Sequence, residues 1–291
     1  MFTNIPVLGV GLGYREPFKA GLFLHRKAID FLEVTADHFF GDSSGTATVG
    51  KTGPISPTSD EGRDLALLKA HFPLIPHGLN LSLGSAEGLD SGYLHQLAAV
   101  IEAVDPPYWS EHIALTKAGG VEIGHLSPVP FSRESTAIVA RNIRTAQDLI
   151  ARPLILENIT YHVRLPFSDL DEAAFLGELL DVTGCGLLLD VTNLHTNSVN
   201  HRFDAVQFLR RLPPDKIVQL HFVGGHWRNG TLIDSHSHAT TPEVWSLLDE
   251  VLKYAPVKGM ILERDENIPP FAELIPELEQ ARALGRKHGR W

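Results

Sequence analysis

The sequence predicts an α/β protein, a single (β/α)8 TIM barrel, and three features of the chain support this fold class. Short apolar runs alternate with segments of helical spacing along the 291-residue chain. A chain of this length suits one barrel of eight strand and helix units. No low-complexity linker interrupts the alternation, so we expect one domain over residues 1–291.

Eight apolar runs bounded by turn-forming residues predict the buried strands of a parallel sheet. They are VLGVGLG (7–13), DFLEVT (30–35), PLIPHGLNLSL (73–83), YWSEHIAL (108–115), LILENI (154–159), GLLLDV (186–191), IVQLHFVG (217–224) and GMILER (259–264). The GVGLG of the first run is only a weak match to a dinucleotide-binding loop, because Tyr14 takes the place of the third glycine.

Six segments between these runs have the apolar spacing of helices. They are EGRDLALLKAHF (61–72), YLHQLAAVIEAV (93–104), RESTAIVARNIRTAQDLI (133–150), DEAAFLGELLDVTG (171–184), DAVQFLRRL (204–212) and PEVWSLLDEVLKYA (242–255). A polar insert rich in Gly, Ser and Thr lies at about 40–62. We expect it to form a solvated loop, or a flap over the barrel mouth.

Composition limits the class of partner. The chain has 35 acidic and 25 basic residues, a formal charge of −10, which argues against a nucleic-acid or anionic membrane partner. Cys185 is the only cysteine, so an internal disulfide and a thiolate metal cage are both excluded. No signal peptide and no apolar run of membrane-spanning length is present, and we therefore expect a cytoplasmic protein.

Ionisable residues occupy the later part of seven apolar runs. They are Glu33, His77, Glu111 with His112, Glu157, Asp190, His221 and Glu263. A barrel brings these strand ends together at one mouth, where barrel enzymes build their sites. Several carboxylates in a dry pocket would repel one another, whereas divalent cations would remove that penalty. The pattern therefore predicts a metal site.

The donor types narrow the choice of metal. Imidazole and carboxylate without thiolate favour iron or manganese, with zinc as an alternative, over magnesium or calcium. So many donors favour a bridged cluster of two or three ions. In DSHSH (234–238), Asp234 and His236 can point to the same side of an extended segment and bind one ion. His226 opens the same loop, and His238 would be a neighbouring or substrate contact.

Seven motifs in order carry a family resemblance. They are HGLNLSLGS (77–85), SEH (110–112), LENI (156–159), LLLDVTNLHTNS (187–198), HFVGGH (221–226), DSHSH (234–238) and ERDENIP (263–269). Together they resemble the multinuclear non-haem iron-dependent oxidases, formerly the DUF692 family. The resemblance implies a xylose-isomerase-like barrel holding two or three irons. It also implies that dioxygen is used to oxidise a residue, often cysteine, of a ribosomally made peptide that a partner protein presents.

The residues differ from the family pattern at Asp37–Phe39, at Glu111 and at His195. We expect Glu111, His195 and His226 to contact substrate, and we assign Glu157 and His238 to catalysis.

The candidate ligands can be divided among three ions. We expect Glu157 to bridge two ions. The expected sets are Asp190, His221 and Glu263 for one ion, His77 and His112 for a second, and Asp234, His236 and Asn193 for a third. A divalent-metal isomerase or endonuclease, and an inactive metal-binding subunit, remain alternative functions on the same barrel.

Overall fold

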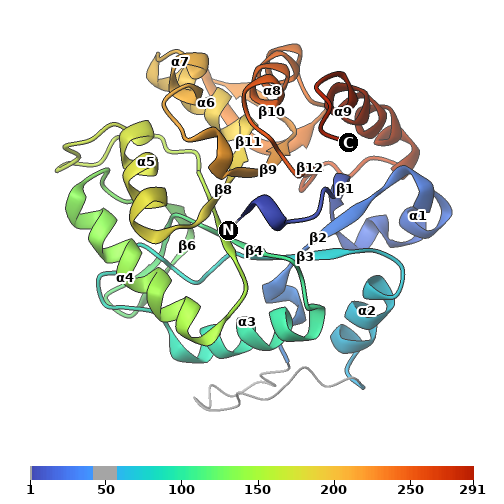
Figure 1. Cartoon of the computed structure of the whole chain (residues 1–291), viewed down its shortest axis with the longest axis horizontal. Helices are drawn as coiled ribbons and strands as arrows, with labels where there is room; N and C mark the ends of the chain where they lie inside the picture. The colour runs from blue at the N-terminus through green and yellow to red at the C-terminus, as the bar shows by residue number, and fades with distance from the viewer. Residues whose placement is uncertain (1, 42–57) are drawn as a thin grey trace.

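Eight parallel strands form a closed barrel in the computed structural model, which describes residues 2–41 and 58–291. In barrel order they are β1 (Gly9–Gly13), β12 (Gly259–Leu262), β9 (Ile217–Phe222), β8 (Gly186–Asp190), β7 (Leu154–Glu157), β4 (Trp109–His112), β3 (Leu74–Gly78) and β2 (Phe31–Thr35). Each of the eight apolar runs contains one of these strands, which confirms the predicted fold class. Figure 1 shows the barrel along its axis, with helices around it.

Helices cover the outside of the barrel (Figure 1). Those of the described residues are α1 (Lys19–Leu24), α2 (Asp60–Lys69), α3 (Ser91–Val104), α4 (Arg133–Leu149), α5 (Glu172–Thr183), α6 (Val191–His201), α7 (Ala205–Leu209), α8 (Pro242–Tyr254) and α9 (Ile275–Lys287). All six predicted helices are present, whereas α1, α6 and α9 were not predicted. Most of the insert expected at 40–62 lies outside the described residues, and its last residues begin α2.

Short 3-10 turns connect several of these elements. They are η1 (Phe2–Asn4), η2 (Glu16–Phe18), η3 (Arg26–Ala28), η4 (Ala36–Phe39), η5 (Pro214–Lys216) and η6 (Phe271–Glu273). Polar side chains begin many of the helices, because an oxygen at the N-cap accepts a free backbone N–H. Ser132, Asp171 and Thr241 do this for α4, α5 and α8.

Apolar side chains fill the barrel near the chain's N-terminus. This cluster contains Phe31, Ile75, Tyr108, Ile155, Leu188, Val218 and Ile261, closed below by Phe2 and Ile5. Strand side chains alternate between the inside and the outside of a barrel, so the next inward layer comes two residues later. That layer holds Glu33, His77, Ser110, Glu157, Asp190 and Glu263. The inward side chains of these strands thus change from apolar to polar or ionisable between one layer and the next.

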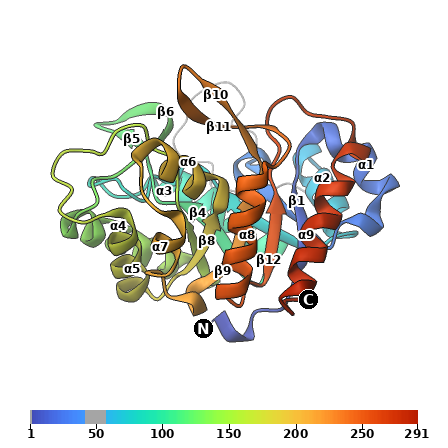
Figure 2. The ribbon, with the colours of Figure 1, turned by 90° about the horizontal axis from the view of Figure 1, so that it is seen from above.

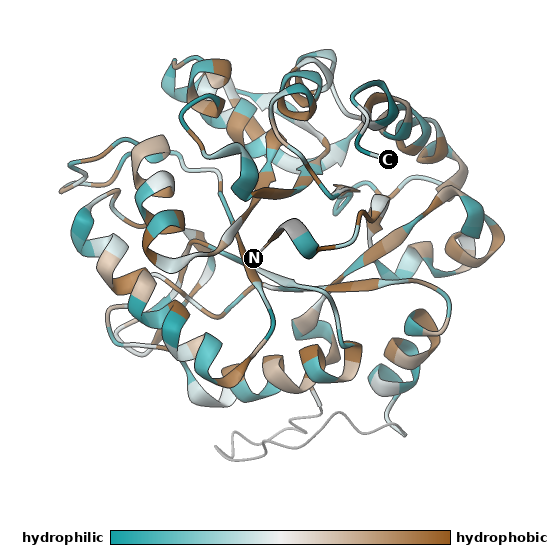
Figure 3. Cartoon of the chain, in the orientation of Figure 1, coloured by the Kyte–Doolittle hydropathy of each residue, from teal (hydrophilic) through white to brown (hydrophobic). Residues whose placement is uncertain are grey.

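Glycine in β1 makes room for this packing. A Cβ on Gly11 would collide with the backbone of Phe31 and the side chain of Ile261. The GVGLG motif therefore serves close strand packing, and it forms a strand in place of a phosphate-binding loop. In Figure 3 the strands are largely hydrophobic, whereas helices such as α4 carry hydrophilic residues as well.

Two antiparallel hairpins extend the loops after β4 and β9. The first pairs β5 (Leu115–Ala118) with β6 (Val121–Ser127), and the second pairs β10 (Gly224–Arg228) with β11 (Thr231–His238). Figure 2 places both hairpins at the end of the barrel away from the N-terminus. Across residues 2–41 and 58–291, the structure has no helix with the length and apolar character needed to span a membrane.

Candidate metal centre

Three adjoining groups of donor atoms lie at the mouth of the barrel. The groups are His77, His112 and Glu157; Glu157, Asp190, His221 and Glu263; and His236, Glu263 and Asp265. Glu157 belongs to the first two groups, and Glu263 to the last two. All members from barrel strands or their immediate ends are buried. The structure therefore brings together six of the eight strand-end residues that the sequence singled out, whereas Glu33 and Glu111 belong to none of the three groups.

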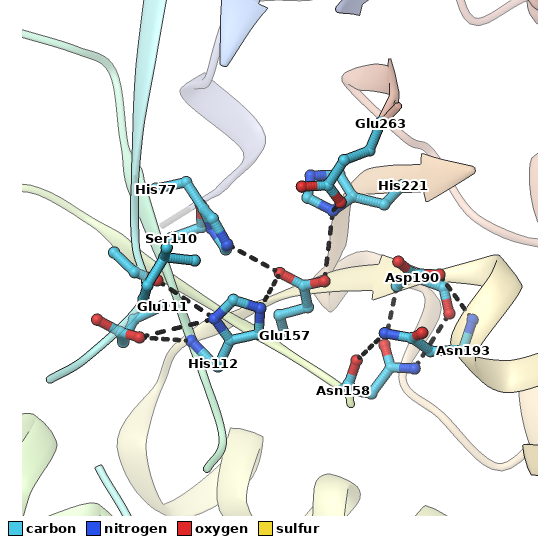
Figure 4. Close-up of polar contacts among 12 residues, drawn as sticks. His77, Ser110, Glu111, His112, Glu157, Asn158, Asp190, Asn193, His221 and Glu263 are labelled. Carbon is cyan, nitrogen blue, oxygen red and sulfur yellow. Dashed lines mark hydrogen bonds and ion pairs between the residues drawn. The ribbon is translucent and has the colours of Figure 1, made fainter. Parts of the chain in front are cut away.

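The first group directs two imidazoles at one carboxylate oxygen (Figure 4). Nε2 of His77 and Nε2 of His112 each lie 3.4 Å from Oε2 of Glu157. The other ring nitrogen of each histidine has a hydrogen-bond partner. Nδ1 of His77 is 2.8 Å from Ser110 Oγ, and Nδ1 of His112 is 3.3 Å from the Gly78 carbonyl oxygen. These contacts leave both Nε2 atoms available to an ion.

The second group lies on the other side of Glu157. Nδ1 of His221 is 3.3 Å from Oε1 of Glu157 and 3.0 Å from Oε2 of Glu263. Asp190 caps α6 by accepting the Asn193 N–H through Oδ1, which leaves Oδ2 facing inward without a partner in the described residues. The two oxygens of Glu157 thus face different donor groups, as the expected bridging role requires.

The third group differs from the predicted set of Asp234, His236 and Asn193. Nδ1 of His236 lies 3.0 Å from Oδ2 of Asp265 and 3.6 Å from Oε2 of Glu263. Asp234 lies on the opposite side of the ring, with Oδ1 2.8 Å from Nε2 of His236. Asn193 lines the same cavity, but its Nδ2 donates to the Asn158 carbonyl. The structure adds Asp265, while ligand roles for Asp234 and Asn193 stay predictions.

A wide bulge in the β10–β11 hairpin explains this arrangement. Gly224 pairs with His238 and His226 pairs with Ile233, so residues 234–237 lie opposite Gly225 alone. His236 has a φ of 50°, which interrupts the extended backbone expected for DSHSH. The carbonyl oxygen of His236 accepts a hydrogen bond from the Asp265 backbone N–H at 3.0 Å, which connects the loop after β12 to the hairpin. This backbone contact brings Asp265 to the imidazole.

A cavity of about 330 Å³ opens above the three groups. Its walls include the group members His112, Glu157, His236, Glu263 and Asp265, and also Arg15, Thr35, His38, Leu79, Leu126, Ile159, Thr160, Asn193 and Asp234. Leu126 comes from β6, so both hairpins contribute to the cavity. Arg15 is a site residue that was not predicted from the sequence. Its position just after β1 was the available signal, because loops at that end of the strands form the mouth.

Arg15 is the positive charge beside the third group. Its NH2 lies 3.0 Å from Oε1 of Glu263, and its Nε donates to Oδ1 of Asp265 at 2.7 Å. Burial opposes the charge, but Asp265 and Glu263 raise the pKa of Arg15 above its ordinary value. Arg15 therefore fixes the two carboxylates that flank His236.

The three residues expected to contact substrate do not line this cavity, and their substrate roles stay predictions. Glu111 is fully buried, with Oε1 accepting the His112 N–H at 2.9 Å, so it presents no surface to a substrate. His195, on α6, lines a separate cavity of about 210 Å³ with Trp227 and Glu243. His226 is 2.8 Å from Ser235 on the hairpin and does not line the cavity over the donors.

His238 also lies outside this cavity, and its catalytic role stays a prediction. It is exposed, and its Nδ1 lies 2.6 Å from Ser237 Oγ. Residues two apart in a regular strand share a face, but the positive φ of His236 breaks that alternation. His238 therefore sits near His226, with ring centroids 5.7 Å apart.

The charges of the donors are strongly coupled. Burial alone would raise the pKa of Glu157, but the imidazoles of His112, His221 and His77 lower it to about 2. Burial would lower the pKa of His112, but Glu157 and Glu111 raise it to about 9. Without metal ions, protonated histidines therefore supply the positive charge that the carboxylates need.

The net pKa shift of Asp190 is opposite to that of Glu157, because no set of imidazoles outweighs burial at Asp190. Burial and the Asp234 carboxylate raise the pKa of Asp190 to about 8. A group with this pKa holds a proton at neutral pH, although the same oxygen could bind a cation.

Unpaired buried atoms provide the test of whether a metal fits. In residues 2–41 and 58–291, the buried atoms without a hydrogen-bond partner include Glu157 Oε2, Asp190 Oδ2, Asn193 Oδ1, both ring nitrogens of His221, Asp234 Oδ1 and His236 Nε2. Leaving such atoms unpaired is costly, and several divalent ions would satisfy them together. The only cysteine, Cys185, is buried outside these groups. The donors therefore suit iron, manganese or zinc.

Comparisons with known proteins agree over nearly the whole chain. Residues 9–286 match the family described as RiPP precursor modification enzyme MbnB/TglH/ChrH. A UPF0276 protein of Caulobacter vibrioides is 36% identical, over 97% of this chain and 95% of the relative. A UPF0276 protein of Chromobacterium violaceum is 34% identical, over 97% of this chain and 96% of the relative.

Solved structures share the fold at low identity. A xylose isomerase domain protein from Alicyclobacillus acidocaldarius is 17% identical with a TM-score of 0.57, over 95% of this chain and 99% of that one. An L-ribulose 3-epimerase is 15% identical with a TM-score of 0.55, over 97% and 96%. These likenesses concern the barrel alone, and they confirm the expected xylose-isomerase-like fold.

Proposed function

The chain belongs to the MbnB/TglH/ChrH family of RiPP precursor modification enzymes, and from this premise we propose that it is a multinuclear non-haem iron oxidase. It would use dioxygen to modify residues, cysteine first among them, of a ribosomally synthesised peptide. The observation that carries the proposal is Glu157, whose two oxygens face two different groups of donors. Such a carboxylate suits a centre with more than one ion.

We assign the first ion to His77, His112 and Glu157. A second would be held by Glu157, Asp190, His221 and Glu263. A third would lie at His236, Glu263 and Asp265, with Asp234 and Asn193 as further candidate donors. Manganese or zinc are alternative ions for the same donors.

The three groups of donors would hold iron ions, which would supply electrons for the reduction of dioxygen. The protein's part is to position the peptide and to keep the centre dry. Leu79, Leu126 and Ile159 give the cavity an apolar wall that would exclude water from a bound side chain. His38 and Thr160 line the same cavity and would orient the peptide by hydrogen bonds. Glu157 keeps its catalytic assignment here.

The partners in this proposal are a precursor peptide and a partner protein that presents it. A cytoplasmic location belongs to the same proposal, because the peptide is a ribosomal product. A nucleic-acid substrate fits poorly, because Arg15, the arginine that lines the cavity, is paired with two carboxylates. The isomerase alternative needs no redox-active ion, so a response of the visible absorption to dioxygen separates the oxidase from it.

The test starts from protein produced with iron supplied and purified without dioxygen. We expect elemental analysis to find more than one iron ion per chain. We also expect dioxygen to change the visible absorption and, with a candidate precursor peptide, to change the peptide's mass. Glu157→Gln should abolish both changes, while Glu172→Gln, at a buried glutamate outside the three groups, should keep them.

Two results would overturn the proposal. One is a fully folded protein with a single ion or none. The other is equal modification of the peptide with and without dioxygen.

A further inference from the structure

A buried polar chain runs from the metal centre toward the closed end of the barrel. Nε2 of His221 lies 2.7 Å from Oε1 of Glu33. Oε2 of Glu33 accepts Nε2–H of Gln219 at 2.6 Å, and Oε1 of Gln219 accepts the hydroxyl of Tyr108 at 2.7 Å. All four residues are at most 3% exposed. Glu33, Gln219 and Tyr108 belong to none of the three donor groups.

The chain has one consistent hydrogen-bond direction. The Tyr108 hydroxyl donates to the amide oxygen of Gln219, and the amide nitrogen donates to Glu33. Oε1 of Glu33 faces Nε2 of His221 in an ion-pair contact and not in a hydrogen bond. Because an ionised carboxylate offers only acceptor atoms, this contact favours a proton on Nε2. The remaining ring nitrogen, Nδ1, faces Glu157 and Glu263, and a proton on Nε2 leaves it free to bind an ion.

Packing alone does not explain this chain. Its lower end lies among Phe31, Ile75, Ile155 and Leu188, which fill the same part of the barrel with apolar side chains. Buried polar groups are costly unless each is bonded, and an apolar layer would serve stability equally well. A role toward His221 accounts for the polar residues.

We propose that Glu33 is a positioning residue, which holds Nε2–H of His221 so that Nδ1 is the metal ligand, and that Gln219 and Tyr108 lock Glu33 in place. Partners of this kind fix the orientation of a ligating imidazole and raise metal affinity. The inference rests on the metal centre of the proposed function, and it is independent of the peptide and of dioxygen.

The experiment uses Zn(II) as a diamagnetic probe on the full-length protein with isotope-labelled histidine. The His221 signal is assigned as the one missing from His221→Asn. We expect its ring carbon and nitrogen shifts to show Nδ1 bound to zinc and a proton on Nε2. In Glu33→Leu that signature should disappear, and zinc affinity should fall about 10- to 100-fold.

Two conservative variants separate positioning from simple packing. Glu33→Gln can still accept from His221 if the Gln219 amide turns over, so we expect most of the signature to remain. Tyr108→Phe keeps the ring and removes only the last hydroxyl, so we expect a smaller loss of affinity than in Glu33→Leu. Should Glu33→Leu not fold, an unchanged zinc affinity and His221 signature in Tyr108→Phe would overturn the locking role. Glu172→Gln is the matched control, with unchanged affinity expected.

The outcomes distinguish this inference from the proposed function. Binding of His221 through Nε2 in the wild-type protein would overturn the positioning role alone. So would wild-type zinc affinity in Glu33→Leu. A wild-type protein that binds no divalent ion would overturn both.

Discussion

The two oxygens of Glu157 contact different sets of imidazoles, His77 and His112 on one side and His221 on the other. Removing this carboxylate would leave three buried imidazoles facing one another without a shared counter-charge. We therefore expect Glu157→Ala to lose more than one metal equivalent and to melt at a lower temperature. Elemental analysis and a thermal melt measure both effects. Full metal content in the variant would contradict the bridging assignment.

At the edge of the centre, His236 and Asp265 belong only to the third group. Asp265 is also more exposed than Glu157, so its loss should disturb the fold little. We expect His236→Ala and Asp265→Ala each to lose about one metal equivalent while the melting temperature of the metal-free protein stays nearly unchanged. Asp234→Ala distinguishes the third ligand set of the structure from the one predicted from the sequence. If Asp234→Ala loses the ion and Asp265→Ala keeps it, the ligand set predicted from the sequence is the right one.

Glu172 is a buried carboxyl away from the centre, and it permits a pH test. It contacts Tyr161 and Asn197, yet burial raises its pKa to about 8. Because the folded pKa lies above the unfolded value of 4.5, folding favours the protonated form. Its contribution to stability is complete below that unfolded value and is lost as the pH rises through about 8. Glu172→Gln removes this dependence.

We expect Glu172→Gln to match the wild type in melting temperature near pH 5. Near pH 9 the variant should melt higher, by a shift on the order of 5 °C. Thermal melts across this pH range measure the difference. Parallel curves for the two proteins would show that the carboxyl of Glu172 has no raised pKa.

At the scale of elements, the strands could be predicted from sequence, because buried parallel strands are continuous apolar runs with abrupt ends. The position of the ionisable strand-end residues could be predicted as well, because residues two apart on the inward face of a strand belong to successive layers of the barrel. The predicted strands extend too far where a hairpin continues the apolar pattern. Leu115 begins β5 and Gly224 begins β10, although both had been included in barrel strands.

The unpredicted parts of the site depend on contacts that local patterns do not contain. Helix α6 carries several polar residues and is fixed by the Asp190 cap, so the spacing of its apolar residues gave little signal. Asp265 approaches His236 through a backbone hydrogen bond across 29 residues of sequence. Arg15 reaches Asp265 across 250 residues. Only the folded chain reveals such partners.

The β10–β11 hairpin must keep its bulge to place His236. A Cβ on Gly225 would collide with the Ile233 carbonyl, directly before the bulged residues 234–237. We therefore expect Gly225→Val to displace the hairpin and lose about one metal equivalent, while the barrel stays folded. Gly177→Ala is the control, because no atom lies near its added Cβ and helix propensity favours alanine by about 1 kcal/mol. Circular dichroism and elemental analysis of both variants provide the test. Full metal content in Gly225→Val would show that the bulge does not position a ligand.

For the whole molecule, metal binding competes with protons. His112 has a pKa of about 9, because Glu157 and Glu111 outweigh the effect of burial. Asp190 has a pKa of about 8, raised by burial and by Asp234. At neutral pH both groups hold a proton in the metal-free protein, and an ion must displace it. The net charge of −10 does not oppose this exchange, since a cation is attracted to an acidic chain.

The direction of the pH dependence follows from these raised values. Both groups stabilise the metal-free fold most at low pH, and the contribution of His112 is lost between its ordinary pKa of 6.5 and about 9. The stabilisation caused by metal should therefore grow over the same range, because fewer protons have to leave. We expect apparent Zn(II) affinity to rise about tenfold per pH unit for each proton released. Calorimetry in buffers of different ionisation enthalpy counts those protons. Binding that releases none at neutral pH would mean that His112 and Asp190 are not displaced by the ion, and the donor sets would have to be redrawn without them.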